Sequence, residues 1–421
     1  MKGVPWQALP PPGIRATRSG TGHGIGTYGM SEFSDQLRRL MAQRNVGVRE
    51  LARQVPCNPG YLSNLRNGRK RPSRSTAARL DLILDASGAL AVFAAGPRAS
   101  TADSCDTALD EATRLRLHAL SGAQIDELAA HLAGQWHALV KTDNLLGPRH
   151  ALGTVHTHLG VIEGLLRAVR PPARQRMLHL GARYAESAAW LHEDSGDLAA
   201  GRYWTGRAME WAVEGGQRRM VSWTLFRRSQ QAMASGDAAQ VGGLAAAARR
   251  EADGLPGPAM AAILQQEAHA HALDGAAADC HRALDRAHAL AADPDDPGDA
   301  SSGHGSFCTP AYLEMQRGAC WLTLGQPAKA IALLGTAVES LPSVYRRDRG
   351  AALSRQAAAF AAVGEPAEAA TAALKALEIA RDSGSGRILR MILPLSAALE
   401  PHSHLDQVAL LRAALAGTRA M

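Results

Sequence analysis

Five glycine-containing turns recur at nearly regular intervals along most of the chain. They are Gly196-Asp197, Gly236-Asp237, Gly275-Ala276, Gly325-Gln326 and Gly364-Glu365. Successive glycines are 40, 39, 50 and 39 residues apart, and alanine- and leucine-rich segments fill the intervals. A period of this length is typical of stacked helical repeats, in which each unit buries its apolar face against its neighbours. The longest interval contains residues 293–305, rich in Pro, Asp, Gly and Ser, which we predict to be a flexible insertion.

Each turn is predicted to join two helices. The first two units place helices at about 175–194 and 198–213, then at about 217–235 and 238–252. Residues 123–169 are expected to form further helix pairs that begin the array. Aromatic residues make up only 4% of the chain, and alternating β-branched runs are nearly absent. We therefore predict an all-α fold.

The segment 311–342 carries the most regular unit. Its Gly-x-x-Tyr…Ala-x-x-x-Phe…Pro spacing is formed by Gly318, Trp321, Ala330, Leu334 and Pro342. In this spacing the segment resembles a tetratricopeptide repeat, and residues 175–416 resemble an array of such repeats with longer helices. The small residues would let paired helices approach closely. An ordinary helical bundle is the alternative interpretation.

A different pattern occupies residues 47–72, with the sequence GVRELARQVPCNPGYLSNLRNGRKRP. Leu51, Ala52 and Val55 share one face of a short helix, because residues three and four apart are helical neighbours. Proline disfavours the helical region for the residue before it, so Pro56 predicts a break. The pattern indicates a short helix that packs through its apolar face.

A second short helix is predicted after this break. Asn58 can supply an N-cap oxygen, and Pro59 suits the first helical position. Leu62 and Leu65 would face inward, and Gly68 would end the helix in a left-handed conformation. A short helix that enters a groove, packed against a partner helix, is the layout of a DNA-binding helix-turn-helix.

The segment resembles the Xre-type (phage-repressor) helix-turn-helix family over about residues 33–93. The matching features are Leu51-Ala52, Tyr61-Leu62-Ser63, Gly68 and Arg71-Pro72-Ser73. Two positions differ from the family pattern. Pro56 replaces a usual glycine, which implies another path for the turn, and Arg66 replaces an often acidic residue, which removes an ion pair at that position. The resemblance implies a DNA-binding transcriptional regulator.

The positive charge is concentrated near the N-terminus. The chain carries a formal charge of +7, to which residues 31–85 contribute +6 and residues 1–30 contribute +3, leaving −2 for the remainder. A local cationic region is the electrostatic footprint of a DNA-binding module. Arginine enrichment from a GC-rich genome is the alternative explanation, but it would spread the charge evenly.

The residues expected to contact DNA lie on and around the second short helix. They are Arg49, Asn58, Pro59, Gly60, Ser63, Asn64, Asn67, Arg69, Lys70, Arg71 and Arg74. Asn64 is the candidate for a base contact, since a carboxamide can bond bidentately to adenine, and a phosphate contact is its alternative role. The cations are expected near phosphates, although Arg74 could instead cap its own helix.

We find no catalytic or metal-binding pattern in the sequence. Histidines two residues apart, as in His156-x-His158, point to different faces of a helix and chelate poorly. Asp194 and Asp197 are interpreted as turn and cap residues. Four tryptophans are interpreted as helix-packing residues: Trp204, Trp211, Trp223 and Trp321. We therefore expect no enzyme activity, no cofactor and no metal.

The sequence also bears on compartment. No window approaches the 18 uninterrupted apolar residues of a membrane span, and the N-terminal segment lacks a signal-peptide core. The five cysteines form no Cys-x-x-Cys pair, which indicates reduced thiols. We expect a cytoplasmic protein without a membrane partner.

These patterns predict a disordered extension at 1–30, a helix-turn-helix domain at 31–95, a linker at 96–110 and a tetratricopeptide-like repeat domain at 111–421. Double-stranded DNA is the expected partner. The repeat domain is expected to form a homodimer and to offer a concave surface for a peptide, small-molecule or protein effector. Candidate effector contacts are Arg227, Gln230 and Gln265. The alternative function is a repeat-based interaction scaffold or antitoxin-like partner binder with a secondary DNA-binding role.

Overall fold

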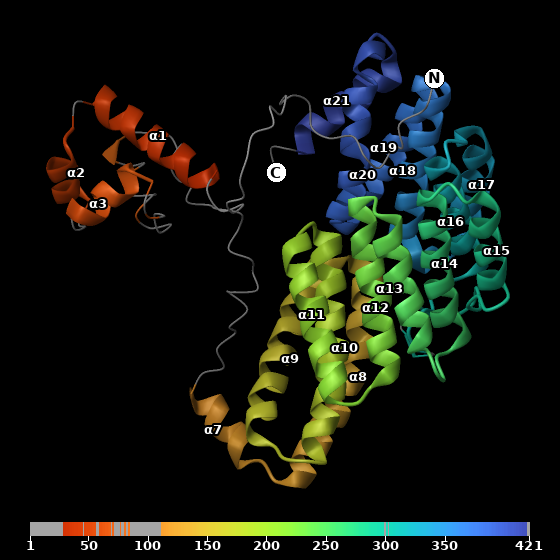
Figure 1. The fold of residues 1–421 in the computed structure, drawn as a ribbon, viewed down its shortest axis with the longest axis horizontal. Helices are drawn as coiled ribbons and strands as arrows, with labels where there is room; N and C mark the ends of the chain where they lie inside the picture. Colours follow the sequence, from red (N-terminus) through yellow and green to blue (C-terminus); the bar gives the residue numbers. More distant parts are fainter. Residues whose placement is uncertain are drawn as a thin grey trace. The chain divides into compact units, whose positions relative to one another are not determined.

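The computed structural model describes residues 28–44, 46–55, 59–68, 70, 76, 80, 83–84, 111–298, 300–301 and 303–418. The chain divides into two compact units, residues 11–104 and a larger unit that holds residues 105–421 (Figure 1). Every regular element within the described ranges is a helix. The predicted all-α fold, a helix-turn-helix domain followed by a helical-repeat domain, is confirmed.

The N-terminal unit is built around three described helices, α1 (Tyr28–Gln43), α2 (Val48–Gln54) and α3 (Pro59–Arg66). Their core contains Phe33, Leu37, Met41, Leu51, Ala52, Val55, Leu62, Leu65, Leu80 and Leu84. The inward positions predicted on α2 and α3 are all in this core. Val55 has left the helical region, with φ −94° and ψ 108°, so α2 ends where the sequence predicts.

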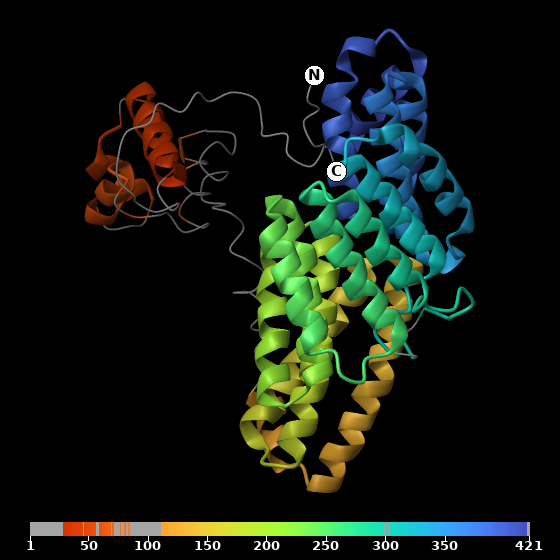
Figure 2. The same cartoon turned by 45° about the vertical axis from the view of Figure 1, so that its right-hand side comes forward.

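The larger unit is a series of helices in which each packs against the next (Figure 2). Its first half consists of α7 (Glu111–Ala119), α8 (Gly122–Leu146), α9 (Pro148–Ala168), α10 (Ala173–Ser195), α11 (Leu198–Glu214), α12 (Arg218–Ala232) and α13 (Ala238–Arg250). Its second half consists of α14 (Gly257–Leu273), α15 (Ala277–His288), α16 (Pro310–Thr323), α17 (Pro327–Ser340), α18 (Arg346–Val363), α19 (Pro366–Ser383), α20 (Gly386–Ala398) and α21 (Asp406–Thr418). The predicted helix pairs agree with α10 to α13 to within a few residues.

The turns between paired helices have the predicted chemistry. All five predicted turn glycines have left-handed φ values, between 68° and 104°. Asp197 caps α11, because its side chain accepts a hydrogen bond of 3.0 Å from the Ala200 N–H. Asp237 caps α13 in the same way through the Gln240 N–H. The repeat period therefore arises from chain reversals that are specified locally.

Paired helices approach closely at small residues. A Cβ placed on Gly318 of α16 would lie 2.7 Å from Leu334 Cγ on α17, which is too close for two carbon atoms. Ala330 is fully buried at the same pair of helices. The expected role of these two small residues is confirmed.

The last helices of the array return to its beginning. Helix α20 packs against α10, and a Cβ on Gly386 would lie 2.7 Å from the Ser195 carbonyl oxygen. Arg390 of α20 donates a 3.0 Å hydrogen bond to the Glu193 carbonyl. The end of the array therefore lies against a helix from its first half.

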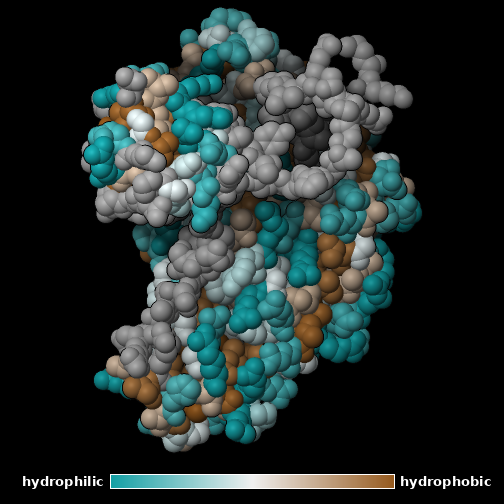
Figure 3. All heavy atoms as spheres, turned by 60° about the vertical axis from the view of Figure 1, so that its left-hand side comes forward, coloured by the Kyte–Doolittle hydropathy of each residue, from teal (hydrophilic) through white to brown (hydrophobic). Residues whose placement is uncertain are grey.

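The surface of the helical-repeat domain is mixed in polarity. On the face drawn in Figure 3, brown hydrophobic side chains lie among teal hydrophilic ones. Large exposed hydrophobic residues in this domain include Leu115, Leu145 and Val213, with 65%, 62% and 62% of their surface accessible. Some large hydrophobic side chains of this domain therefore lie on its surface and not in its apolar core.

Candidate functional site

The exposed side of α3 carries the residues predicted to face DNA. Gly60 and Asn67 are exposed, and Ser63 and Asn64 are half-buried. Leu62 and Leu65, on the opposite side, are fully buried. Packing therefore fixes the rotation of α3 and leaves its polar side accessible.

The end of α3 is closed by a left-handed glycine. Gly68 has φ 67°, and its N–H donates a 3.1 Å hydrogen bond to the Leu65 carbonyl. The Lys70 N–H then donates to the Asn64 carbonyl at 3.3 Å, and the Lys70 side chain is exposed. This turn holds one of the predicted phosphate-contacting cations beside the helix.

The remaining predicted DNA contacts are only partly described. Arg49 is the second residue of α2, and Pro59 begins α3, as the sequence predicts. Four predicted contacts lie outside the described residues: Asn58, Arg69, Arg71 and Arg74. Arg53 was not predicted as a contact; it is an exposed cation in the last turn of α2 and pairs with Glu50.

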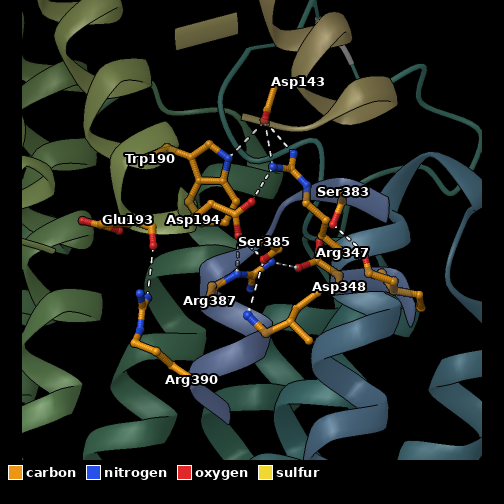
Figure 4. Close-up of polar contacts among 12 residues, drawn as sticks. Asp143, Trp190, Glu193, Asp194, Arg347, Asp348, Ser383, Ser385, Arg387 and Arg390 are labelled. Carbon is orange, nitrogen blue, oxygen red and sulfur yellow. Dashed lines mark hydrogen bonds and ion pairs between the residues drawn. The ribbon is translucent and has the colours of Figure 1, made fainter. Parts of the chain in front are cut away.

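A second candidate site lies inside the helical-repeat domain and begins with a buried ion cluster (Figure 4). Arg347 of α18 donates to both carboxylate oxygens of Asp143 on α8, at 2.8 and 2.6 Å. The same guanidinium donates to Asp194 on α10 at 2.6 Å. Arg387 of α20 also pairs with Asp194, at 3.2 Å. These ion pairs thus connect four helices, α8, α10, α18 and α20, that do not follow one another in the sequence.

Asp194 was predicted to be a turn residue, and this was wrong. Its side chain is fully buried, and besides the two arginines it accepts a 2.8 Å hydrogen bond from Ser385 Oγ. Burial opposes its ionisation, but Arg387 and Arg347 outweigh that effect and hold the Asp194 pKa below its ordinary value. Asp143 differs, because burial dominates there and raises its pKa. Asp194 is therefore the anionic centre of the cluster.

A cavity of about 190 Å³ lies beside this cluster. Its walls are rich in aromatic side chains, which are Trp136, Trp190, Trp223, Phe226, Phe307, Tyr312 and Tyr345. Trp190 connects the cavity to the cluster, since its Nε1 donates to Asp143 at 3.2 Å. The cavity thus combines aromatic faces with a charged edge, a composition that suits small-molecule sites. Trp223 lines it as well as packing against Phe226, with ring centroids 4.6 Å apart.

The segment predicted as a flexible insertion forms one wall of this cavity. Its described residues Gly298, Ala300, His304 and Gly305 line the space. Asn144 Nδ2 donates to the Gly298 carbonyl at 2.6 Å, and the Ala292 N–H donates to the Cys308 carbonyl at 2.9 Å at the base of the loop. The segment is an insertion, as predicted, but it is packed against the helices.

The three predicted effector contacts have different environments. Arg227 and Gln230 line the cavity, and the Arg227 guanidinium pairs with Glu193 at 2.6 Å and with Glu186 at 3.4 Å. Gln265 is 1% exposed and does not line this cavity. Gln265 is therefore not at the accessible position expected for it on α14, and its role as an effector contact stays a prediction.

His156 and His158 contact different partners, as their two-residue spacing on α9 predicts. His156 contacts His192 (Nε2 to Nε2, 2.9 Å), whereas His158 contacts the Tyr184 hydroxyl at 3.0 Å. Within the parts of the chain that are described, no group of three His, Cys, Asp or Glu residues could hold a metal ion. No helix placed by the structure has the length and apolarity that a membrane crossing needs.

Sequence reasoning did not find the ion cluster or the cavity. Arg347 belongs to an Arg-rich segment with the appearance of a solvated helix start, and its partners lie 204 and 153 residues away. One signal was available: α8 and α10 each carry a tryptophan and acidic residues among their alanines and leucines. That signal does not identify the pairs.

The comparison with known families agrees with the geometry of the N-terminal unit. A family model described as a helix-turn-helix domain matches residues 32–92. No curated protein matches the chain. The N-terminal unit is therefore a helix-turn-helix domain, which suggests a DNA-binding regulator.

Proposed function

We propose that this protein is a sequence-specific DNA-binding transcriptional regulator of the Xre type. The observation that carries the proposal is the match of the helix-turn-helix model to residues that fold as α1, α2 and α3. In this arrangement Leu62 and Leu65 are buried, whereas Ser63 and Asn64 are accessible. Placing α3 in the major groove would bring Asn64 to base edges and the flanking cations to phosphates.

We further propose a homodimer held by a tetratricopeptide-like repeat domain. One helix-turn-helix contacts one half-site, and linking two such contacts raises affinity without new interactions. An effector bound in the repeat domain would then change how the two half-sites are presented. No catalytic step is assigned to the protein, and it would act in the cytoplasm.

Selection of bound duplexes from a random DNA pool tests the proposal. We expect enrichment of one sequence with two inverted half-sites, and sedimentation of the full chain at micromolar concentration as a dimer. Enrichment of a single half-site by a monomer would reject the dimer but keep the regulator. Failure to enrich any sequence would reject the DNA-binding function and favour the scaffold or partner binder.

A further inference from the structure

The cavity in the repeat domain has flat aromatic walls that face a common space. Trp223 lies 4.9 Å from the His304 ring, measured between centroids, with 37° between the ring planes. Trp136 lies 5.9 Å from the same ring. Phe307 packs between Trp223 and Tyr312, at 6.2 and 5.0 Å. These distances are contacts of the wall residues with one another. The parts of these rings that line the cavity favour a planar guest, because aromatic rings prefer offset-stacked or edge-to-face contacts.

The charged groups at the cavity edge are already paired. Arg347 and Arg387 share Asp194, and Arg387 also contacts Asp348 at 3.3 Å. Arg227 pairs with Glu186 and Glu193. A charged guest would have to break one of these buried pairs or remain uncompensated, and both are costly. A neutral guest avoids this cost.

Several residues that line the cavity, among them Trp223, Arg227 and His304, have a buried polar atom without a hydrogen-bond partner in the described part of the chain. His304 Nε2 is buried and has no hydrogen-bond partner among the described residues. Burial, aided by the nearby Arg183, lowers the His304 pKa to about 3, so the ring is neutral at neutral pH. A neutral imidazole nitrogen without a partner can donate or accept one hydrogen bond, depending on the tautomer. Buried polar groups are normally satisfied, which indicates that a guest completes this one.

We propose that this cavity binds a neutral one- or two-ring heteroaromatic molecule, with its ring against Trp223 and Trp136 and its ring nitrogen hydrogen-bonded to His304. The size agrees, since an apolar cavity of about 150 Å³ accommodates benzene and this one measures about 190 Å³. That such a molecule acts as the effector rests on the proposed function, whereas its binding in the cavity does not.

Isosteric probes test the hydrogen bond separately from the stacking. Calorimetry with the full chain would compare indole with indene, which lacks the N–H, and quinoline with naphthalene, which lacks the ring nitrogen. We expect the heteroaromatic member of one pair to bind about five- to tenfold more tightly, according to the tautomer of His304. His304→Leu should abolish that preference and change hydrocarbon binding by less than about twofold. His402→Leu, an exposed histidine elsewhere, is the matched control.

A second variant tests the location of the site. Val140 is half-buried and lines the cavity, so Val140→Phe should fill the space and weaken all four probes at least tenfold. Val213→Phe, on the exposed side of α11, should not. Absence of binding by every probe would overturn the proposal, as would equal binding in the Val140→Phe variant. If Val140→Phe does not fold, the His304→Leu comparison decides alone.

Two further measurements separate this proposal from the proposed function. Indole-3-carboxylate and tryptamine should bind at least tenfold more weakly than indole, and equal affinity would overturn the requirement for a neutral guest. Binding of the selected DNA duplex is then measured with and without the tighter probe. A change in DNA affinity supports the effector role, and an unchanged affinity rejects it. Loss of all DNA binding rejects the regulator and leaves the cavity result standing.

Discussion

Arg347 and Asp143 form a two-point ion pair between α18 and α8, although they are 204 residues apart in the sequence. The two N–O distances are 2.8 and 2.6 Å, and both side chains are buried. Bidentate arginine–carboxylate pairs are geometrically specific as well as strong. This pair and its neighbour Asp194 therefore determine how the end of the array meets its beginning.

Asp194→Asn should strongly destabilise the repeat domain. The change removes the negative charge that Arg347 and Arg387 share, and it leaves the buried Arg347 and the half-buried Arg387 guanidinium groups under-compensated. Breaking a buried pair from one side costs about 3–5 kcal/mol in free energy of unfolding. Urea unfolding at neutral pH, followed by circular dichroism, measures this loss. Asp126→Asn is the control, because Asp126 and its partner Arg176 are both exposed and should contribute less than about 1 kcal/mol.

Stability should fall as the pH drops below about 6.5. His269 is 4% exposed, and burial, opposed by a hydrogen bond to Gln316, lowers its pKa to about 4. The folded-state pKa is below the unfolded value, so this contribution is complete above pH 6.5 and is lost as the pH falls towards 4. For this histidine alone the loss between pH 7 and pH 5 is about 2 kcal/mol. His269→Gln should flatten the pH profile of unfolding, and an unchanged slope would contradict the assignment.

Two glycine substitutions should have opposite effects on stability. Gly318→Ala places a Cβ 2.7 Å from Leu334 Cγ and should cost about 1–3 kcal/mol through overpacking. Gly134→Ala, in the middle of α8, meets nothing within 4 Å and should stabilise by up to about 1 kcal/mol through helix propensity. Thermal unfolding of both variants measures the difference. A neutral Gly318→Ala variant would show that α16 and α17 can separate without loss.

Asn64→Ala should weaken binding to the selected DNA sequence by about 1–3 kcal/mol and relax preference at one base pair. The physical reason is the loss of a bidentate carboxamide contact. Competition gel shifts with single-base variants of the site measure the preference. Ser34→Ala, a buried polar position on α1, is a control for general damage to the domain. Equal loss on selected and random DNA would assign Asn64 to a phosphate contact.

The cations after α3 should contribute affinity without sequence preference. Replacing Arg69, Lys70 and Arg71 with alanine should reduce the log–log salt slope of DNA binding by about one unit per lost phosphate contact. Affinity is measured by fluorescence anisotropy across a series of salt concentrations. An unaltered slope in the triple variant would remove these residues from the DNA interface.

The elements of this fold were largely predictable because their causes are local. The turn at Gly196 follows from a left-handed glycine and the Asp197 cap, which are adjacent in sequence. The inward face of α3 follows from the spacing of Leu62 and Leu65. For the same reason the rotation of α3, and thus its accessible side, follows from the sequence alone.

The cavity and the ion cluster were not predictable because their causes are not local. Asp194 has the sequence context of a turn residue, and nothing adjacent indicates that Arg347 and Arg387 will meet it. His304 lies in a segment whose Pro, Asp and Gly content is typical of a solvated loop. It packs against Trp136 of α8 and Trp223 of α12, which come well before it in the chain. Which of these distant residues contact one another can be learned only from the tertiary structure.

The contact between α20 and α10 also affects when this part of the protein can fold during its synthesis. Asp194 and Arg387 are 193 residues apart, so at about 5–20 residues per second a ribosome delivers the arginine about 10–40 s after the aspartate. Until Arg347, the earlier of its two arginine partners, is made, the carboxylate must remain hydrated, and the helices around it cannot adopt their final packing. A chain that stops before Arg347 would hold this state permanently. Such fragments should be short-lived in the cell, because quality-control proteases would recognise an array whose helices never reach their final packing.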